Sequence, residues 1–266
     1  MLDLNDKKIL VTGAGGVGVG AGVCQSLDQF GATIIINEIS IEKAESAAKR
    51  YAKAIPVAAD IGDIGQVVSM FETIKEEVGV IDGLVNNAGV GLSKQAHLAS
   101  EQEFDKLYDI DMKGVWQVPK LFVNQLLEAQ KPGSIVNISS VNALATMSRY
   151  AIYASAKAAV EGLTMGMAVE LGVHKIRVNA IGPGLVQAEQ NYDLVKTWSD
   201  DPENWLREFP FDQQAIPEDI QPIECGLVVA FLLSVLSCAV TGQTLYVDKG
   251  TTSLVFNGSF TGVGHC

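Results

Sequence analysis

Short apolar runs recur along the whole chain and alternate with segments whose apolar residues follow a helical period. The runs cover residues 8–12, 33–37, 54–59, 83–85, 134–139, 176–181 and 244–247. Most are apolar at nearly every position, which is typical of strands buried on both faces. Strands that alternate with helices form parallel sheets through right-handed crossovers. We therefore predict an α/β fold in which helices cover both faces of a parallel sheet.

The helical segments are clearest over residues 41–51, 63–78, 101–130, 150–171 and 223–236. Asp63 is expected to cap one of them, because its carboxylate can accept hydrogen bonds from the free N–H groups of a first turn. Pro119 lies inside the longest segment and lacks a backbone N–H, so it predicts a kink or a local break there.

The size and charge of the chain narrow its function class. Its 266 residues are 48% apolar, enough for one large α/β domain or two small ones. No linker-like segment or repeat divides them, so we expect a single domain over residues 1–266. The formal charge of −12 would repel phosphate backbones and anionic lipids, so we expect no nucleic-acid partner and no membrane partner. The four cysteines lack metal-like spacing, which argues against a metal site and fits a reduced, cytoplasmic compartment.

A glycine-rich stretch, residues 13–20, follows the first apolar run and precedes a helical segment. Such a loop lets the backbone approach a pyrophosphate, and the helix after it offers free N–H groups and a positive dipole end. On its own, the stretch is also compatible with an ordinary flexible turn.

Glu38 stands at the end of the second apolar run. An acid at this place accepts hydrogen bonds from the adenosine ribose in dinucleotide-binding folds and would repel a 2′-phosphate. Ile39 and Ser40 follow it, so no arginine is adjacent to pair such a phosphate. NAD is therefore favoured over NADP. The alternative is a solvated glutamate that opens the next helix.

Tyr153 and Lys157 are four residues apart in a predicted helix, so they lie on one face, one turn apart. The charge of the lysine favours the phenolate form of the tyrosine, which suits an acid–base catalyst. Ser140, at the end of the fifth apolar run, supplies a hydroxyl that would hold the reacting oxygen. An isolated pair with this spacing is more often an unrelated surface tyrosine and lysine, so the assignment depends on the rest of the chain.

In order and spacing, the motifs resemble those of the short-chain dehydrogenases/reductases, from Lys8 to about Gly250. The matching pieces are Thr12-Gly13 with Gly18-Val-Gly20, Asp60-Ile61, Asn86-Asn-Ala-Gly89, Ser139-Ser140, Tyr153-x-x-x-Lys157, Arg177-Val-Asn-Ala, Pro183-Gly184 and Thr241-Gly-Gln-Thr-Leu-Tyr-Val-Asp248. The resemblance implies a single Rossmann-like domain with a doubly wound, parallel seven-stranded sheet in the order 3-2-1-4-5-6-7. It also implies NAD(P)-dependent interconversion of an alcohol and a ketone, with NAD expected here because of Glu38.

The resemblance assigns roles to individual residues. Tyr153 would be the general acid/base, Ser140 would orient the substrate oxygen, and Lys157 would hold the nicotinamide ribose. The expected cofactor-binding residues are Gly13, Gly18, Val19, Gly20, Glu38, Asp60, Ile61, Asn87, Ala88, Gly89, Tyr153, Lys157, Pro183, Gly184 and Val186. The expected substrate contacts are Ser140, Asn142, Tyr153, Leu185 and Tyr192.

Three positions depart from the family pattern. Val17 makes the glycine loop one residue longer, and Ala188 stands where a threonine often binds the carboxamide. Asp111 replaces the catalytic asparagine, and an ionised aspartate can only accept hydrogen bonds. We expect Asp111 to keep the helix bulge of the family if it accepts from a backbone N–H, and to draw the charge of Lys157 toward itself. Catalysis would then be reduced but retained.

Residues 185–220 are rich in aromatic side chains and are expected to form a lid over a bulky, partly apolar substrate. The alternative is that these aromatic side chains only pack the lid onto the body. Relatives usually form dimers or tetramers through helices at 101–130 and 150–171, so we expect a homo-oligomer, a homotetramer rather than a dimer. The tail, residues 251–266, would dock on its own or a neighbouring subunit.

A different class of function is an NAD-binding sensor or structural partner of the same fold with little catalysis. The three departures favour it. The intact set of Ser140, Tyr153 and Lys157 opposes it, because a protein without catalysis has no chemical need for all three.

Overall fold

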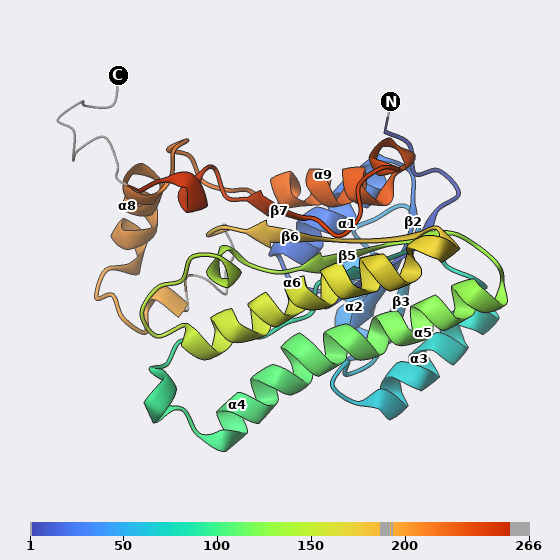
Figure 1. The fold of residues 1–266 in the computed structure, drawn as a ribbon, viewed down its shortest axis with the longest axis horizontal. Coiled ribbons are helices and arrows are strands. Elements are labelled where there is room, and N and C mark those ends of the chain that lie inside the picture. Colours follow the sequence, from blue (N-terminus) through green and yellow to red (C-terminus); the bar gives the residue numbers. More distant parts are fainter. Residues whose placement is uncertain (1, 187–191, 193, 256–266) are drawn as a thin grey trace.

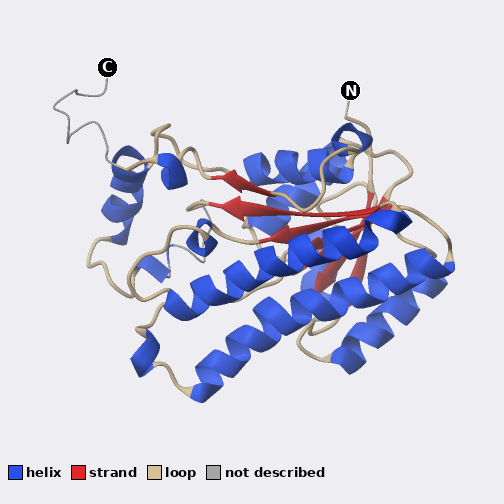
Figure 2. Cartoon of the chain, in the orientation of Figure 1, coloured by secondary structure: helices blue, strands red, loops and turns tan. Residues whose placement is uncertain are grey.

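The seven strands form one parallel sheet in the order β3-β2-β1-β4-β5-β6-β7, as predicted (Figures 1 and 2). A computed structural model describes residues 2–186, 192 and 194–255 of the chain. Ala188 and residues 256–266 of the tail lie outside this part. The strands are β1 Lys8–Thr12, β2 Thr33–Glu38, β3 Ala54–Ala58, β4 Gly83–Asn86, β5 Gly133–Ile138, β6 Ile176–Pro183 and β7 Thr244–Val247.

Helices cover both faces of this sheet, and Figure 1 shows α9 on one side of it and α3, α5 and α6 on the other. The α-helices are α1 Val19–Gln29, α2 Ile41–Ala48, α3 Ile64–Glu77, α4 Glu101–Tyr108, α5 Val115–Glu128, α6 Ala151–Leu171, α8 Pro202–Gln213 and α9 Pro222–Leu233. The short helical turns are η1 Ala96–Leu98, η2 Asp109–Gly114, η3 Val141–Ala143, η4 Gly172–His174, η5 Val235–Ser237 and η6 Thr251–Ser253. In the described part of the chain no helix is long and apolar enough to span a bilayer.

Two apolar cores follow from the alternation of side chains along the strands. In β2, Ile34 and Ile36 pack toward the core that includes α1 and α9, whereas Ile35 packs toward the core of α3 and α5. All three side chains are fully buried. Successive side chains of a strand point to opposite faces, so a strand covered on both sides must be apolar at consecutive positions. This requirement explains the continuous apolar runs of the sequence.

The long helical segment predicted over 101–130 is two helices, and the break falls at η2, a π-helix, rather than at Pro119. Pro119 lies inside α5 and has no N–H for the carbonyl oxygen of Val115, four residues before it. The side-chain amide of Asn86 donates to that oxygen at 3.3 Å. Helix α5 therefore continues through Pro119 without the predicted local break, and a side chain from β4 satisfies the carbonyl group that the proline leaves free. The alternative, a kink at Pro119, stays a prediction.

Candidate active site

The sequence-predicted site residues gather at the carboxyl edge of the sheet. All strands are parallel, so their carboxyl ends meet at one edge, where ligands bind in open α/β sheets. Figure 2 shows the arrowheads of the nearest strands pointing toward the end of the molecule that carries α8. The residues at or just after these strand ends are Gly13, Glu38, Asp60, Asn87, Ser140 and Pro183.

Ser140 follows β5 and is positioned by its own turn. Its Oγ accepts hydrogen bonds from the backbone N–H of Asn142 at 3.2 Å and from the side-chain amide of the same residue at 3.3 Å. Both contacts use acceptor sites of the hydroxyl, so its single O–H stays available as a donor. The side chain is therefore fixed in place by contacts that leave it able to donate to a substrate oxygen.

Lys157 is buried in α6 beside Asp111 of η2. Its Nζ lies 2.9 Å from Oδ2 of Asp111, and the two side chains are 5% and 0% exposed. The ammonium also donates to the carbonyl oxygen of Ile138, at the end of β5, at 3.2 Å. The ring centroid of Tyr153 is 5.6 Å from the same Nζ, so the ammonium lies close to the tyrosine as well as to the carboxylate.

The pKa of Lys157 reflects two opposing causes. Burial alone would lower it, because a charged amine is poorly solvated in a protein interior. The negative charges of Tyr153, as phenolate, and of Asp111 outweigh burial and raise the pKa of Lys157 above its ordinary value. Lys157 is therefore held in its cationic form at neutral pH.

Asp111 lies in the π-helix η2, which is the helix bulge expected from the family pattern. Its Oδ1 accepts a hydrogen bond from the backbone N–H of Val90 at 2.7 Å, in the loop that follows β4. A methyl group added at Gly89 would lie 3.0 Å from Oδ2 of Asp111 and 3.3 Å from Nζ of Lys157. The backbone at Gly89 therefore packs directly on the ion pair, and a side chain there would press on both charged groups.

An aromatic row leads from Tyr153 to the predicted lid. Tyr150 packs edge-to-face on Tyr153 at a centroid distance of 5.9 Å, and Trp198 packs in the same way on Tyr150 at 6.3 Å. Trp205 follows at 6.0 Å and Phe209 of α8 at 5.2 Å. The first three of these pairs are edge-to-face and favourable at these distances, so the segment that carries Trp198 and Trp205 is packed against the start of the helix that carries Tyr153.

The glycine-rich loop and α1 fit a dinucleotide. Helix α1 begins after Gly18 with no side-chain cap and with no acidic residue in its first turn, so its first N–H groups are open to an anion. A methyl group added at Gly16 would meet nothing within 4 Å, whereas one at Gly13 would lie 2.6 Å from the backbone of Ala88. The loop thus packs closely on the turn after β4 and is open at its tip.

Glu38 contacts the same loop instead of pointing into solvent. Its Oε1 accepts from the N–H of Gly15 at 2.7 Å, and its Oε2 accepts from its neighbour Ile39 at 3.2 Å. Helix α2 is capped by Ser40 rather than by Glu38. A carboxylate has about four acceptor sites, so two remain for ribose hydroxyls.

Several predicted cofactor residues are structural anchors in this fold. The side-chain amide of Asn87 donates to the carbonyl oxygens of Thr12 and Gly13, each at 2.9 Å, and Asp60 accepts from the N–H of Gly62. Ile61 and Val186 are buried, and Val186 belongs to the core that includes α1. The predicted residues Val19, Gly184, Leu185, Asn142 and Tyr192 are partly exposed.

Arg50, just after α2, is a residue that sequence reasoning missed. Its guanidinium donates to the carbonyl oxygens of Gly15 and Gly16, both at 3.0 Å. Arg50 follows these glycines by about 35 positions, and no sequence motif links the two segments. Their proximity is therefore visible only in the fold.

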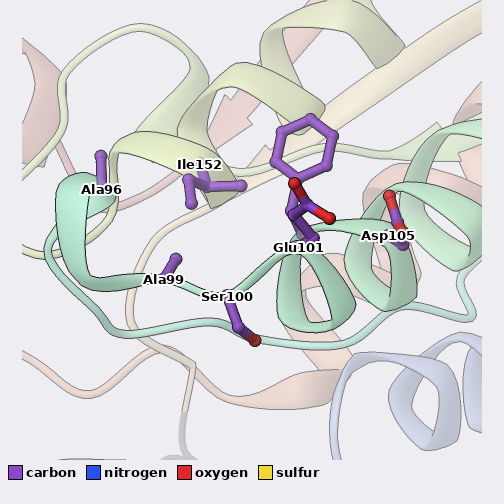
Figure 3. A pocket seen from close by; sticks show the side chains of 7 residues that line it. Ala96, Ala99, Ser100, Glu101, Asp105 and Ile152 are labelled. Carbon is purple, nitrogen blue, oxygen red and sulfur yellow. The ribbon is translucent and has the colours of Figure 1, made fainter.

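A surface hollow of about 460 Å³ lies between η1, α4 and the start of α6 (Figure 3). Phe104 and Ile152 form its apolar part, and Glu101 and Asp105 are at its acidic rim. None of the predicted catalytic residues lines it. Among the described residues, no group of three or more His, Cys, Asp or Glu side chains is arranged to hold a metal ion.

Comparison with known proteins agrees with this geometry. A family model described as enoyl-(acyl carrier protein) reductase matches residues 13–252. The chain is 34% identical to human L-xylulose reductase over 94% of this chain and 98% of the relative. It is 38% identical to the oxidoreductase UcpA of Salmonella typhimurium, over 94% of this chain and 95% of the relative. A gluconate 5-dehydrogenase from Burkholderia cenocepacia, solved with NADP and tartrate, superposes with a TM-score of 0.86 at 30% identity, covering 96% of this chain and 98% of the other.

Proposed function

Because the chain belongs to the short-chain dehydrogenase/reductase family of nicotinamide-dependent oxidoreductases, we propose that it interconverts a secondary alcohol and a ketone with NAD(H). The observation that carries the proposal is the placement of Ser140, Tyr153 and Lys157 at the carboxyl edge of the sheet. Ser140 keeps a free O–H donor, and Lys157 is a buried cation one helical turn from Tyr153.

The roles of the three residues follow from their contacts. In alcohol oxidation the Tyr153 phenolate takes the proton of the substrate hydroxyl, and in ketone reduction its O–H returns a proton to the carbonyl oxygen. Ser140 donates its O–H to the same oxygen and holds it beside Tyr153. Lys157 stabilises the phenolate by its charge. A bound nicotinamide supplies or accepts the hydride.

The preference for NAD rests on Glu38. Its carboxylate is fixed by the N–H of Gly15 at the end of β2, where it would accept from ribose hydroxyls and repel a 2′-phosphate. One solved relative contains NADP, so the fold alone does not decide between the two cofactors. The assignment therefore depends on this carboxylate in this chain.

The substrate is proposed to be bulky and partly apolar, covered by a lid over about 185–220. The aromatic row brings Trp198 and Trp205 to the side of Tyr150, next to the catalytic tyrosine, where a cover over the substrate is needed. The same contacts also fit the alternative, in which these side chains only pack the segment onto the body. The names of two relatives, L-xylulose reductase and gluconate 5-dehydrogenase, suggest polyhydroxylated compounds as competing candidates.

We also infer a homo-oligomer, a tetramer rather than a dimer, in the cytoplasm. Helices α5 and α6 expose Trp116, Met165 and Val169, which are 45%, 56% and 83% accessible. Exposed apolar side chains on neighbouring helices are typical of surfaces buried by a second copy. The cysteines in the described residues are free thiols, which fits a reducing compartment.

The experiment that tests the proposal follows nicotinamide absorbance with NAD(H) and NADP(H). The panel contains aliphatic and cyclic secondary alcohols and ketones, together with L-xylulose and gluconate. We expect turnover with NAD(H), and with at least one apolar member of the panel. Binding of NAD without turnover of any member would instead favour the sensor function, and faster turnover with NADP(H) would contradict the role of Glu38.

A further inference from the structure

Arg50 contacts three successive carbonyl groups of the glycine-rich loop. Nη1 donates to Gly16 and Nη2 to Gly15, both at 3.0 Å, and Nη2 also lies 3.5 Å from the carbonyl oxygen of Ala14. Nε donates to the carbonyl oxygen of Ala47 at 3.3 Å, which ties the guanidinium to its own helix. In the described part of the chain no carboxylate is within ion-pair distance of Arg50, so its partners are loop and helix carbonyl groups.

These contacts set the direction of the peptide groups in the loop. In a planar trans peptide the N–H points away from the C=O. The carbonyl groups of residues 14–16 face Arg50, so the N–H groups of residues 15–17 face the opposite side. The peptide group between Ala14 and Gly15 shows this arrangement, because its C=O lies 3.5 Å from Nη2 of Arg50 and its N–H donates to Glu38 at 2.7 Å. Arg50 therefore lies behind the loop, and Glu38 lies in front of it.

The lengthened loop has few other contacts that would hold its tip. Val17, the additional residue, is 55% exposed, and space around Gly16 is open. Glycine-rich backbone loses much conformational entropy when it is ordered, so a loop of this kind needs fixed contacts to keep one conformation. The planar fork of an arginine can hold several carbonyl groups at once. The next residue, Tyr51, donates to Ala21 at 3.3 Å and fixes the first turns of α1 in the same way.

We propose that Arg50 is a positioning residue for the dinucleotide, which turns the N–H groups of the lengthened glycine loop toward the pyrophosphate. This inference rests on the proposed function, since it takes the ligand to be a nicotinamide dinucleotide. Arg50 acts from behind the loop, on the side away from Glu38, so it does not meet a 2′-phosphate. Its contribution to binding is therefore the same for NAD and NADP.

The test measures affinity for NAD⁺ and NADP⁺ by titration calorimetry in wild type, Arg50→Gln and Arg50→Lys. We expect Arg50→Gln to weaken both affinities by about tenfold, which is about 1.4 kcal/mol, and to leave their ratio unchanged. Arg50→Lys keeps the charge but lacks the planar fork, so its affinities should lie between those of wild type and of Arg50→Gln. Lys49→Gln removes a neighbouring exposed charge and should change neither affinity. Hydrogen exchange of the ligand-free proteins should be faster over residues 14–20 in Arg50→Gln than in wild type.

Four results would overturn the positioning role. A loss of NADP⁺ affinity alone would make Arg50 a direct partner of the 2′-phosphate. Unchanged affinities, or unchanged exchange of the loop amides, would show that the loop does not depend on Arg50. A wild type that binds neither dinucleotide would overturn the proposed function and the positioning role together, while the exchange comparison would still report whether Arg50 orders the loop.

Discussion

Nζ of Lys157 and Oδ2 of Asp111 lie 2.9 Å apart with both side chains almost fully buried. The family pattern that the sequence resembles has an asparagine at the position of Asp111, so this chain has an additional negative charge beside the proposed catalytic lysine. A buried ion pair is costly to break, because removing one partner leaves the other charge unpaired in a poorly solvated site. The charge of Lys157 in α6 therefore depends on the carboxylate of Asp111 in η2.

Replacing Asp111 by asparagine tests this coupling. The amide oxygen can still accept from Val90, but the amide N–H₂ group then faces the ammonium of Lys157 and cannot pair with it. The pKa of Lys157 should fall, and its charge should act more strongly on Tyr153. We expect the pH profile of kcat/KM for alcohol oxidation to move to lower pH by about one unit, with faster turnover at neutral pH. An unchanged pH profile would contradict the coupling.

Replacing Asp111 by alanine tests the structural part of the pair. Lys157 would lose its partner, and the N–H of Val90 would lose its acceptor, so we expect a loss of about 3 kcal/mol in the free energy of unfolding by urea. Asp111→Asn is the matched control and should lose less free energy of unfolding than Asp111→Ala.

The sign of the pH dependence follows from the raised pKa of Lys157. Its contribution to stability is complete below its ordinary pKa of 10.5 and is lost only as the pH rises through the higher folded value. Asp111→Ala lacks a charge that raises this pKa, so its loss of stability should be largest at neutral pH and should shrink as the pH rises through the lower folded pKa of its Lys157. A loss that is absent at pH 7 would contradict the pairing.

The aromatic row gives a graded prediction for the lid. Trp198→Leu breaks the row next to Tyr150, whereas Phe209→Leu shortens it at its far end. We expect KM for the ketone to rise about tenfold in Trp198→Leu and less in Phe209→Leu, with NAD affinity unchanged in both. Steady-state kinetics and NAD titration measure these values. Equal effects of the two variants would show that the row does not transmit the position of the lid to Tyr153.

Glu161 connects three elements next to the catalytic serine. Its carboxylate accepts from Oγ of Ser139 at 2.8 Å and from the hydroxyl of Tyr246 at 3.1 Å. Burial and the charge of Glu161 raise the pKa of Tyr246 to about 12. We expect Glu161→Leu to lower kcat about tenfold with little change in NAD affinity, because Ser140 is then less firmly placed. Glu161→Gln keeps an acceptor and should retain most of the activity; equal losses in both variants would argue for a role of the charge itself.

The sheet was predictable because its signal is local. Strands such as Thr33–Glu38 are buried on both faces, so each carries its own apolar run. The π-helix at Asp109–Gly114 was expected only by resemblance, because its contacts come from Val90 and Lys157, distant in the chain. The local break predicted at Pro119 does not occur, because Asn86 donates to the carbonyl oxygen of Val115, and no local rule of sequence identifies this distant donor.

The site was predictable where the chain carries spaced motifs, as at Tyr153 and Lys157. Arg50 has no such motif, and its role depends on the geometry that brings the end of α2 to the glycine-rich loop. The substrate contacts are the least predictable part, because residues 185–220, the proposed lid, have no periodic pattern.

Tyr153 is proposed to transfer the proton that accompanies hydride transfer. Tyr153→Phe removes one hydroxyl and keeps the ring that packs on Tyr150. The decisive measurement pairs NAD⁺ titration with turnover of the best substrate in this variant. We expect wild-type NAD⁺ affinity and a loss of kcat of at least about a thousandfold. Turnover near the wild-type rate would contradict the assignment of Tyr153 as the acid–base catalyst.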